Sequence, residues 1–274
     1  LDRLSYISGK NRSLVCLGLD PDPALMPTRD VLGFNKAVVD TTKDLVCAFK
    51  PNLAYYEALG LDGLRILSDT VKHIRSVAPD VVVIGDGKRG DIESTNLMYA
   101  RALFEFWEFD AATVNAYAGI SSLGPFFDYG DRGIFIWCRS SNPSAGELQD
   151  IPVPEQVDGM PIFESVALKT VDSNKKGNLG LVVGATYPEE LGAVRERAAE
   201  LPILVPGIGK QGGDLERSVR AGLASVEPRL LISSSRGITY ASKDHRDFAD
   251  VAAATATKLR DRINKTLDEL GRGW

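Results

Sequence analysis

The chain contains 274 residues with 32 basic and 37 acidic side chains, which gives a formal net charge of −5. Its hydrophobic share of 44% and charged share of 25% are typical of a globular protein, and no apolar run approaches the ~18 residues that a membrane span needs. The mildly acidic composition with mixed signs argues against a nucleic-acid surface.

Eight short apolar, β-branched runs recur along the chain, and amphipathic stretches separate most of them. Continuous apolar character, without alternation, is typical of strands buried on both faces of a parallel sheet. The predicted strands are 14–19, 45–49, 81–84, 112–114, 133–137, 179–183, 203–205 and 230–233. The predicted crossover helices are 30–46, 61–77, 95–109, 188–200 and 215–223.

The number of strands favours a closed barrel over an open doubly wound sheet, which more often has roughly five or six strands. We therefore predict an α/β fold, a single (β/α)8 TIM barrel domain over residues 1–274, with its active site at the carboxyl ends of the strands. Segment 142–164 holds four prolines and is predicted to be a long loop, of the kind that often forms a lid.

Polar and glycine-rich residues follow nearly every predicted strand. In chain order these segments are 20–21, 50–52, 86–91, 115–117, 139–143, 206–207 and 235–237. The carboxyl ends of the strands meet at one face of a barrel. We therefore expect these segments to build one site.

The densest of these segments is IGDGKRGDIEST, residues 84–95. Asp86 and Lys88 are two residues apart on or just past a strand, so both side chains are expected on the same face, toward the barrel axis. Asp91 follows in the turn, and Thr95 falls in the first helical turn. Two carboxylates alternating with an ammonium group keep one another ionised. The alternative, a solvated charged loop, is disfavoured by the apolar strand that precedes it.

Two further charged residues end predicted strands directly before a proline, which favours an extended conformation. Lys50 ends the run Cys47-Ala-Phe-Lys, and Asp20 ends the first strand. On this evidence Lys50 either joins the charged array or is a surface lysine with its ammonium group in water.

The loops after the seventh and eighth strands are a common phosphate site in such barrels. Glycines in segment 205–214 expose backbone N–H groups, and Arg236 offers a bidentate fork for phosphate oxygens. A plain glycine-rich turn is the alternative. Two matches to the dinucleotide pattern G-x-G-x-x-G, starting at Gly85 and Gly207, lack its other features, so a Rossmann site is not expected.

Cysteine and histidine usage excludes several other classes of site. Three cysteines without paired spacing indicate a reducing compartment, so we expect a cytoplasmic protein. Cys16, Cys47 and Cys138 lie in apolar stretches, which predicts buried, unreactive thiols. The histidines, His73 and His245, have no ligand-type spacing, so neither a histidine metal site nor Ser-His-Asp catalysis is predicted.

The motif Asp86-x-Lys88-x-x-Asp91-Ile92-x-x-Thr95, together with the strand-end Lys50, resembles the orotidine 5′-monophosphate decarboxylase family over nearly the whole chain. The long segment 142–164 resembles its longer-chain subfamily. Many members have glycine where Ser235 stands here. The resemblance implies the following site residues: Lys50, Asp86, Lys88 and Asp91 for catalysis, Asp20 and Thr95 for substrate binding, Ser141 for the pyrimidine, and Gln211 and Arg236 for the phosphate.

This resemblance implies decarboxylation of orotidine 5′-monophosphate to UMP and carbon dioxide in de novo pyrimidine biosynthesis. The implied reaction uses neither a metal ion nor a cofactor. Fixed charges in the site would stabilise a ring carbanion that Lys88 protonates. The implied partners are the nucleotide substrate and a second copy of the chain, with Asp91 and Thr95 contributed across a homodimer interface. Neither nucleic acid nor a membrane is an implied partner.

Two alternative functions remain open at this point. Magnesium-dependent lyases that act on sugar phosphates share the Asp-x-Lys-x-x-Asp triplet, but they carry an acidic residue where Lys50 stands here. A non-catalytic barrel that binds nucleotide phosphates is the other alternative. Binding alone does not require the alternating charges of Lys50, Asp86, Lys88 and Asp91, which disfavours it.

Overall fold

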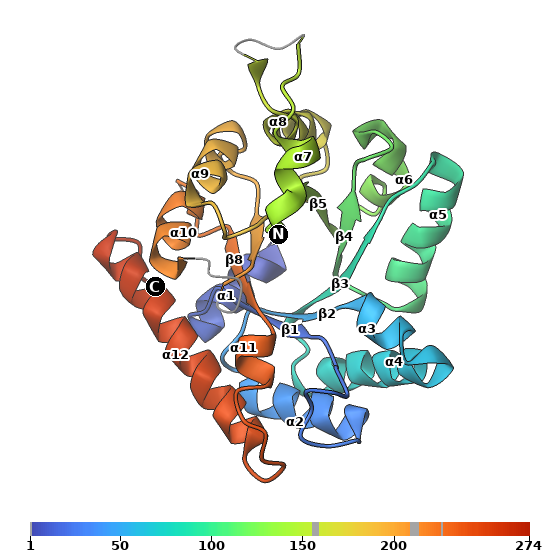
Figure 1. Cartoon of the computed structure of the whole chain (residues 1–274), viewed down its shortest axis with the longest axis vertical. Helices are drawn as coiled ribbons and strands as arrows, with labels where there is room; N and C mark the ends of the chain where they lie inside the picture. The colour runs from blue at the N-terminus through green and yellow to red at the C-terminus, as the bar shows by residue number, and fades with distance from the viewer. Residues whose placement is uncertain (1, 155–158, 209–213, 226) are drawn as a thin grey trace.

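The structure, a computed structural model, describes residues 2–154, 159–208, 214–225 and 227–274. Eight parallel strands form a closed barrel in sequence order, and helices surround it (Figure 1). The predicted (β/α)8 barrel is thereby confirmed. The strands are β1 (Val15–Leu19), β2 (Ala48–Pro51), β3 (Val82–Arg89), β4 (Ala111–Asn115), β5 (Gly133–Arg139), β6 (Leu179–Val183), β7 (Ile203–Pro206) and β8 (Leu230–Ser234).

The strands occupy the predicted runs because their apolar side chains are buried on both faces of the sheet. All five residues of β1 are buried, as are those of β6 and β8. The first and last strands close the barrel through the pairs Val15–Ile232, Cys16–Ser233 and Leu17–Ser234. Two strands differ most from their predictions: β2 begins three residues and ends two residues later than predicted, and the pairing of β3 with β4 continues past the apolar run into the charged segment.

Helices connect the strands on the outside of the barrel. They are α1 (Asp2–Asn11), α2 (Val31–Thr42), α3 (Leu53–Glu57), α4 (Gly60–Val77), α5 (Glu93–Arg101), α6 (Gly124–Phe127), α7 (Gly146–Gln149), α8 (Ile162–Ser173), α9 (Pro188–Arg197), α10 (Leu215–Gly222), α11 (Arg236–Thr239) and α12 (Phe248–Glu269), with the short turns η1 (Ala102–Phe106), η2 (Ile120–Leu123) and η3 (Pro143–Ala145). Within the described ranges, none of these helices combines the length and apolar character needed to cross a membrane.

Local signals explain where several helices begin. Asp30 caps α2 because its carboxylate accepts the Gly33 N–H at 2.9 Å, and Asp214 caps α10 in the same way. The helix predicted over 95–109 is divided into α5 and the π-helical turn η1. No helix was predicted at α1, α8 or α12.

Segment 142–164, predicted to be a loop, contains η3 and α7, and α8 begins within it at Ile162. Beyond α7 the described parts of this segment extend outward from the barrel (Figure 1). A bridge between Pro152 and Pro161 and the bond from the Val153 N–H to the Met160 carbonyl join its two sides.

The three cysteines are buried, as predicted. Burial raises the pKa of Cys16 to about 12, and it raises the pKa values of Cys47 and Cys138 further. A thiol with such a pKa is almost fully protonated at neutral pH and therefore a poor nucleophile. The thiols thus belong to the core.

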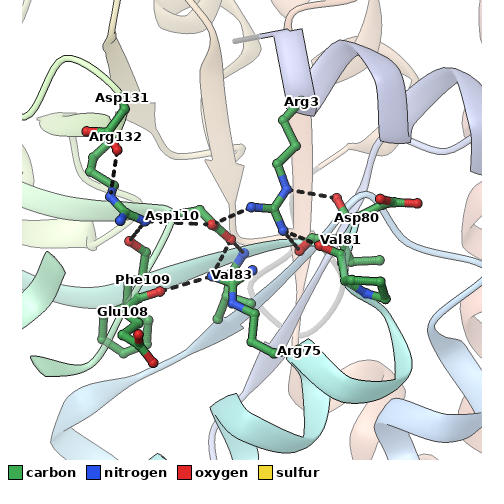
Figure 2. A network of polar contacts seen from close by, with 11 residues as sticks. Arg3, Arg75, Asp80, Val81, Val83, Glu108, Phe109, Asp110, Asp131 and Arg132 are labelled. Carbon is green, nitrogen blue, oxygen red and sulfur yellow. Dashed lines mark hydrogen bonds and ion pairs between the residues drawn. The ribbon is translucent and has the colours of Figure 1, made fainter. Parts of the chain in front are cut away.

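A cluster of arginines around Asp110 fixes α1 across the amino-terminal end of the barrel (Figure 2). Arg3 of α1 contacts Asp110 Oδ1 at 2.6 Å, and Arg75 of α4 contacts Oδ2 at 2.7 Å. The Val83 N–H donates to Oδ2, also at 2.7 Å, and Arg132 lies 4.0 Å from Oδ1. One carboxylate thus links α1, α4 and the starts of β3 and β4.

We predict that Asp110→Asn lowers the free energy of unfolding by roughly 2–3 kcal/mol, because it leaves partly buried guanidinium groups without their anion. Urea denaturation followed by circular dichroism measures this change. The matched control is Asp131→Asn, since Asp131 is 76% exposed and should contribute little. Equal stability of the two variants would contradict the assignment. Folded Asp110→Asn should keep its activity, since Asp110 precedes β4 and lies at the end opposite the carboxyl-terminal face.

Candidate active site

Most of the predicted site residues line one cavity of about 390 Å³ at the carboxyl ends of the strands. They reach it from β1, β2, β3, β5 and β8, so residues far apart in the sequence meet there. These residues are Asp20, Lys50, Asp86, Lys88, Ser141 and Arg236. The predicted meeting of strand-end segments in one place is therefore observed for these six.

The charged array at the floor of the cavity is centred on Asp86. Lys50 Nζ lies 2.6 Å from Asp86 Oδ2, and Lys88 Nζ lies 2.7 Å from Asp86 Oδ1. Lys50 and Asp86 are buried, whereas the Lys88 side chain is 33% exposed toward the cavity. Lys50 is therefore a member of the array and not a surface lysine. Both lysines line the cavity, and Lys88 is the more exposed of the two to a bound molecule.

Mutual pairing keeps the buried members of the array charged. Burial alone would raise the pKa of Asp86, but the ammonium groups of Lys50 and Lys88 outweigh it and hold that pKa far below its usual range. Burial would likewise lower the pKa of Lys50, but the carboxylates of Asp86 and Asp20 outweigh it and raise that pKa. Lys50 and Asp86 are thus both ionised at neutral pH.

The backbone at Lys88 departs from the regular strand on which its prediction was based. Pairing of β3 with β4 passes directly from Asp86–Thr113 to Arg89–Val114, so Gly87 and Lys88 form a bulge. Lys88 has a φ of 43°, which costs a residue with a Cβ about 1–2 kcal/mol. Its side chain contacts Asp86, as expected, but a strained bulge brings it there and not the alternation of side chains along a regular strand.

Two side-chain oxygens in the cavity wall are buried without a polar partner among the described residues. Asp20 Oδ1 and Ser235 Oγ are buried and accept or donate no hydrogen bond within the part of the chain that the structure describes. Leaving such atoms unpaired costs free energy, which a bound polar ligand would offset. Asp20 and Ser235 are therefore suited to bind hydroxyl or similar groups.

Arg236 begins α11, directly after β8, and its side chain is exposed at the cavity rim. Among the described residues it has no ion-pair partner within 4.0 Å, so its guanidinium group is available to an anion. Ser141 follows β5, and its backbone packs so closely on Gly184 that a Cβ there would lie 2.6 Å from the Ser141 nitrogen. The predicted phosphate ligand Gln211 lies outside the described residues.

Asp91 and Thr95 are not among the described residues that line this cavity. Asp91 is exposed at the start of α5, where its Oδ1 accepts the Ile92 N–H at 2.7 Å. It lines a separate cavity together with Asn115 and Tyr117. Within one chain the structure thus brings Lys50, Asp86 and Lys88 together but leaves Asp91 and Thr95 apart from them.

Several residues for which no role was predicted support the array. Thr113 Oγ1 donates to Asp86 Oδ1 at 2.7 Å, and Asn115 Nδ2 donates to the Lys88 carbonyl at 3.0 Å. Lys88 Nζ also lies 5.8 Å from the centre of the Trp137 ring, where a cation is attracted to the π face. A polar residue such as Thr113 inside the apolar run of β4 was the available signal.

Arg139, the last residue of β5, begins the segment 139–143 that was expected at the site, but no role was predicted for it. It is buried and forms an ion pair with Glu190 at 2.5 Å and with Asp150 at 3.0 Å. Gln149 of α7 accepts the Ser140 N–H at 2.9 Å. These contacts connect α7 to the end of β5 and to α9, and they hold the backbone that leads into Ser141.

Comparison with known proteins gives a consistent result along the chain. Residues 13–250 match the family model described as "Orotidine 5'-phosphate decarboxylase / HUMPS family". The chain is 48% identical to the orotidine 5'-phosphate decarboxylase of Thermomicrobium roseum, covering 98% of this chain and 96% of that protein. It is 43% identical to the enzyme of the same name from Ralstonia pickettii, over 96% and 97% of the two chains. The solved structure of Leishmania donovani OMP decarboxylase has a TM-score of 0.80 at 34% identity, covering 95% and 98%.

Proposed function

The chain belongs to the orotidine 5′-phosphate decarboxylase / HUMPS family, and from this premise we propose that it converts orotidine 5′-monophosphate to UMP and carbon dioxide in pyrimidine biosynthesis. The observation that supports this most strongly is the ionised array of Lys50, Asp86 and Lys88 in one cavity. Asp20 and Arg236 line the same cavity, which supports their proposed contacts with the ribose and the phosphate.

In the proposed reaction the bond between carbon 6 of the pyrimidine and its carboxylate breaks, and the electron pair stays on carbon 6. No adjacent carbonyl delocalises this carbanion, so charges fixed in the cavity must stabilise it. Lys88 supplies the positive charge and donates a proton from Nζ to carbon 6, which gives UMP. The resulting amine regains a proton from water. Asp86 lies beside the substrate carboxylate and is relieved of a like charge when carbon dioxide leaves.

The remaining site residues are proposed to hold the substrate. Asp20 and Lys50 bind the ribose hydroxyls, with the unpaired Asp20 Oδ1 as an acceptor. Ser141 contacts the pyrimidine, while Arg236 and Gln211 bind the phosphate. Binding energy from the remote phosphate can favour closure of the surrounding loops and the exclusion of water.

A spectrophotometric assay with orotidine 5′-monophosphate in excess EDTA tests this function. We expect turnover to UMP that EDTA does not reduce. Loss of turnover in EDTA, restored by Mg²⁺, would favour a magnesium-dependent lyase. Equilibrium binding of the nucleotide without turnover would favour a non-catalytic barrel. Either result would refute the proposal.

We further propose a homodimer in which Asp91 and Thr95 complete the partner's site. Their position outside their own chain's cavity supports this, since the family resemblance assigns Asp91 to catalysis and Thr95 to substrate binding. Large apolar side chains around them are exposed, which is typical of a surface that another protein covers. Ile92 is 62% exposed, Met98 51% and Tyr117 86%. A two-fold pair would make the exchange of Asp91 reciprocal.

Complementation between two inactive variants, Lys88→Ala and Asp91→Asn, tests the shared site. After subunit exchange of equal amounts, about half of the dimers are hybrids by random pairing, and each hybrid contains one intact site. We therefore expect roughly a quarter of the native activity, measured on the exchanged mixture. The control is each variant put through the same exchange alone. If hybrids form but activity does not return, Asp91 serves its own subunit.

A further inference from the structure

The bulge at the end of β3 leaves Lys88 in an unfavourable backbone conformation and outside the regular hydrogen-bond ladder. Gly87 and Lys88 lie between two successive β3–β4 pairs, so the regular ladder does not hold the Lys88 peptide groups. A positive φ of 43° is also unfavourable for a lysine. The position of Nζ depends on this backbone, so other contacts must keep Lys88 in its conformation.

Side chains from β4 supply those contacts. The Lys88 N–H donates to Thr113 Oγ1 at 3.0 Å, and the Lys88 carbonyl accepts from Asn115 Nδ2 at 3.0 Å. Both backbone groups of the strained residue are thus bonded to neighbouring side chains. Asn115 is itself held, since its Oδ1 accepts the Tyr117 N–H at 3.1 Å. A Cβ at Gly90 would lie 2.3 Å from the Asn115 carbonyl oxygen, so the turn packs directly on this residue.

The Thr113 hydroxyl also orders the carboxylate of the array. While its oxygen accepts from the Lys88 backbone, its single proton is donated to Asp86 Oδ1 at 2.7 Å. The same carboxylate oxygen also accepts a hydrogen bond from Lys88 Nζ. Thr113 is buried, and a β-branched side chain has few rotamers in a strand. One hydroxyl therefore fixes the backbone of Lys88 and the partner of its ammonium group together.

We infer that Thr113, assisted by Asn115, is a positioning residue that sets where Lys88 Nζ stands relative to the reacting carbon. This inference rests on the proposed function. It predicts a defect in the chemical step and not in substrate binding, because Arg236 binds the phosphate on a different loop. A displacement of a catalytic group by about 1 Å can cost ~10²-fold in rate.

The test compares Thr113→Val, which keeps the shape of the side chain, with Thr113→Ser, which keeps the hydroxyl. We expect Thr113→Val to lower kcat by about 10- to 100-fold. KM for orotidine 5′-monophosphate and inhibition by UMP should change little. Thr113→Ser should restore most of kcat. The matched control is Thr42→Val on α2, a buried threonine whose hydroxyl donates to the Val38 carbonyl, which should keep kcat.

Several outcomes would overturn the inference. Wild-type kcat in Thr113→Val would do so, and so would a failure of Thr113→Ser to restore it or an equal loss of UMP binding. If Thr113→Val does not fold, Asn115→Ala replaces it, with the same expected fall in kcat at unchanged KM and the same contradicting results. A wild-type protein inactive on orotidine 5′-monophosphate would refute the proposed function and the inference together. An active wild type with an unaffected Thr113→Val variant would refute the inference alone.

Discussion

Replacing Lys88 by alanine is expected to lower kcat by about 10²–10⁴-fold, the usual contribution of a positioned proton donor. Lys88 Nζ lies 2.7 Å from Asp86 Oδ1, and its side chain is partly exposed to the cavity. Lys50 is buried and paired with Asp86 Oδ2, so it cannot replace Lys88 without moving. In the proposed mechanism the variant therefore loses both the cation beside the developing carbanion and the proton that completes the product.

Steady-state kinetics with orotidine 5′-monophosphate measure this loss, and UMP inhibition shows whether the variant still binds nucleotide. Binding should remain measurable because the phosphate and ribose contacts are intact. Lys72→Ala on α4 is the matched control, since Lys72 is 71% exposed and lies far from the array in sequence. A Lys88→Ala variant that retains more than about a tenth of wild-type turnover would remove Lys88 from the role of proton donor.

The second large effect is expected at Arg236, where we propose that the phosphate binds. Arg236→Ala should raise KM for orotidine 5′-monophosphate, with a loss of about 2–4 kcal/mol of binding free energy if the bound guanidinium group makes a bidentate, enclosed contact. Arg236 is exposed at the rim and has no ion-pair partner in the described part of the chain, so its removal should not disturb the fold.

Orotidine without its phosphate provides the internal comparison for Arg236→Ala. The slow reaction of this nucleoside should barely change, because it makes no contact that the arginine provides. Arg65→Ala on α4, where Arg65 is exposed and paired with Asp62, should leave both substrates unaffected. An equal loss with the nucleotide and the nucleoside would make Arg236 a structural residue.

The fold could be predicted closely because the strands and the barrel depend on local patterns. Continuous apolar runs indicated all eight strands. The length of β3 was underestimated because Asp86, Lys88 and Arg89 interrupt its apolar character, although its pairing with β4 continues. Helix α12 was not assigned, although it is rich in alanine and other residues with high helix propensity. Segment 142–164 was predicted to be a loop because it holds four prolines, but prolines do not indicate the short helices that lie between them.

The charged array was predictable in composition but not in geometry. Strand-end positions placed Asp86 and Lys88 at one face and left Lys50 either in the array or at the surface. The structure brings all three into contact. The positive φ at Lys88 depends on contacts from β4, which no spacing within β3 encodes. Proximity in sequence was also a poor guide for Asp91, because the turn at Gly90 directs it away from the cavity that Lys88 enters.

Closure of the barrel between β1 and β8 has a consequence for biosynthesis. The pair Val15–Ile232 joins opposite ends of the chain, so a polypeptide still on the ribosome cannot form it until β8 has emerged. Until then the edges of β1 and β7 are exposed and can pair with other chains. Asp20 and Arg236 flank the same seam, so the cavity is completed only in the last stage of translation. A nascent chain thus exposes these strand edges for as long as its cavity is incomplete.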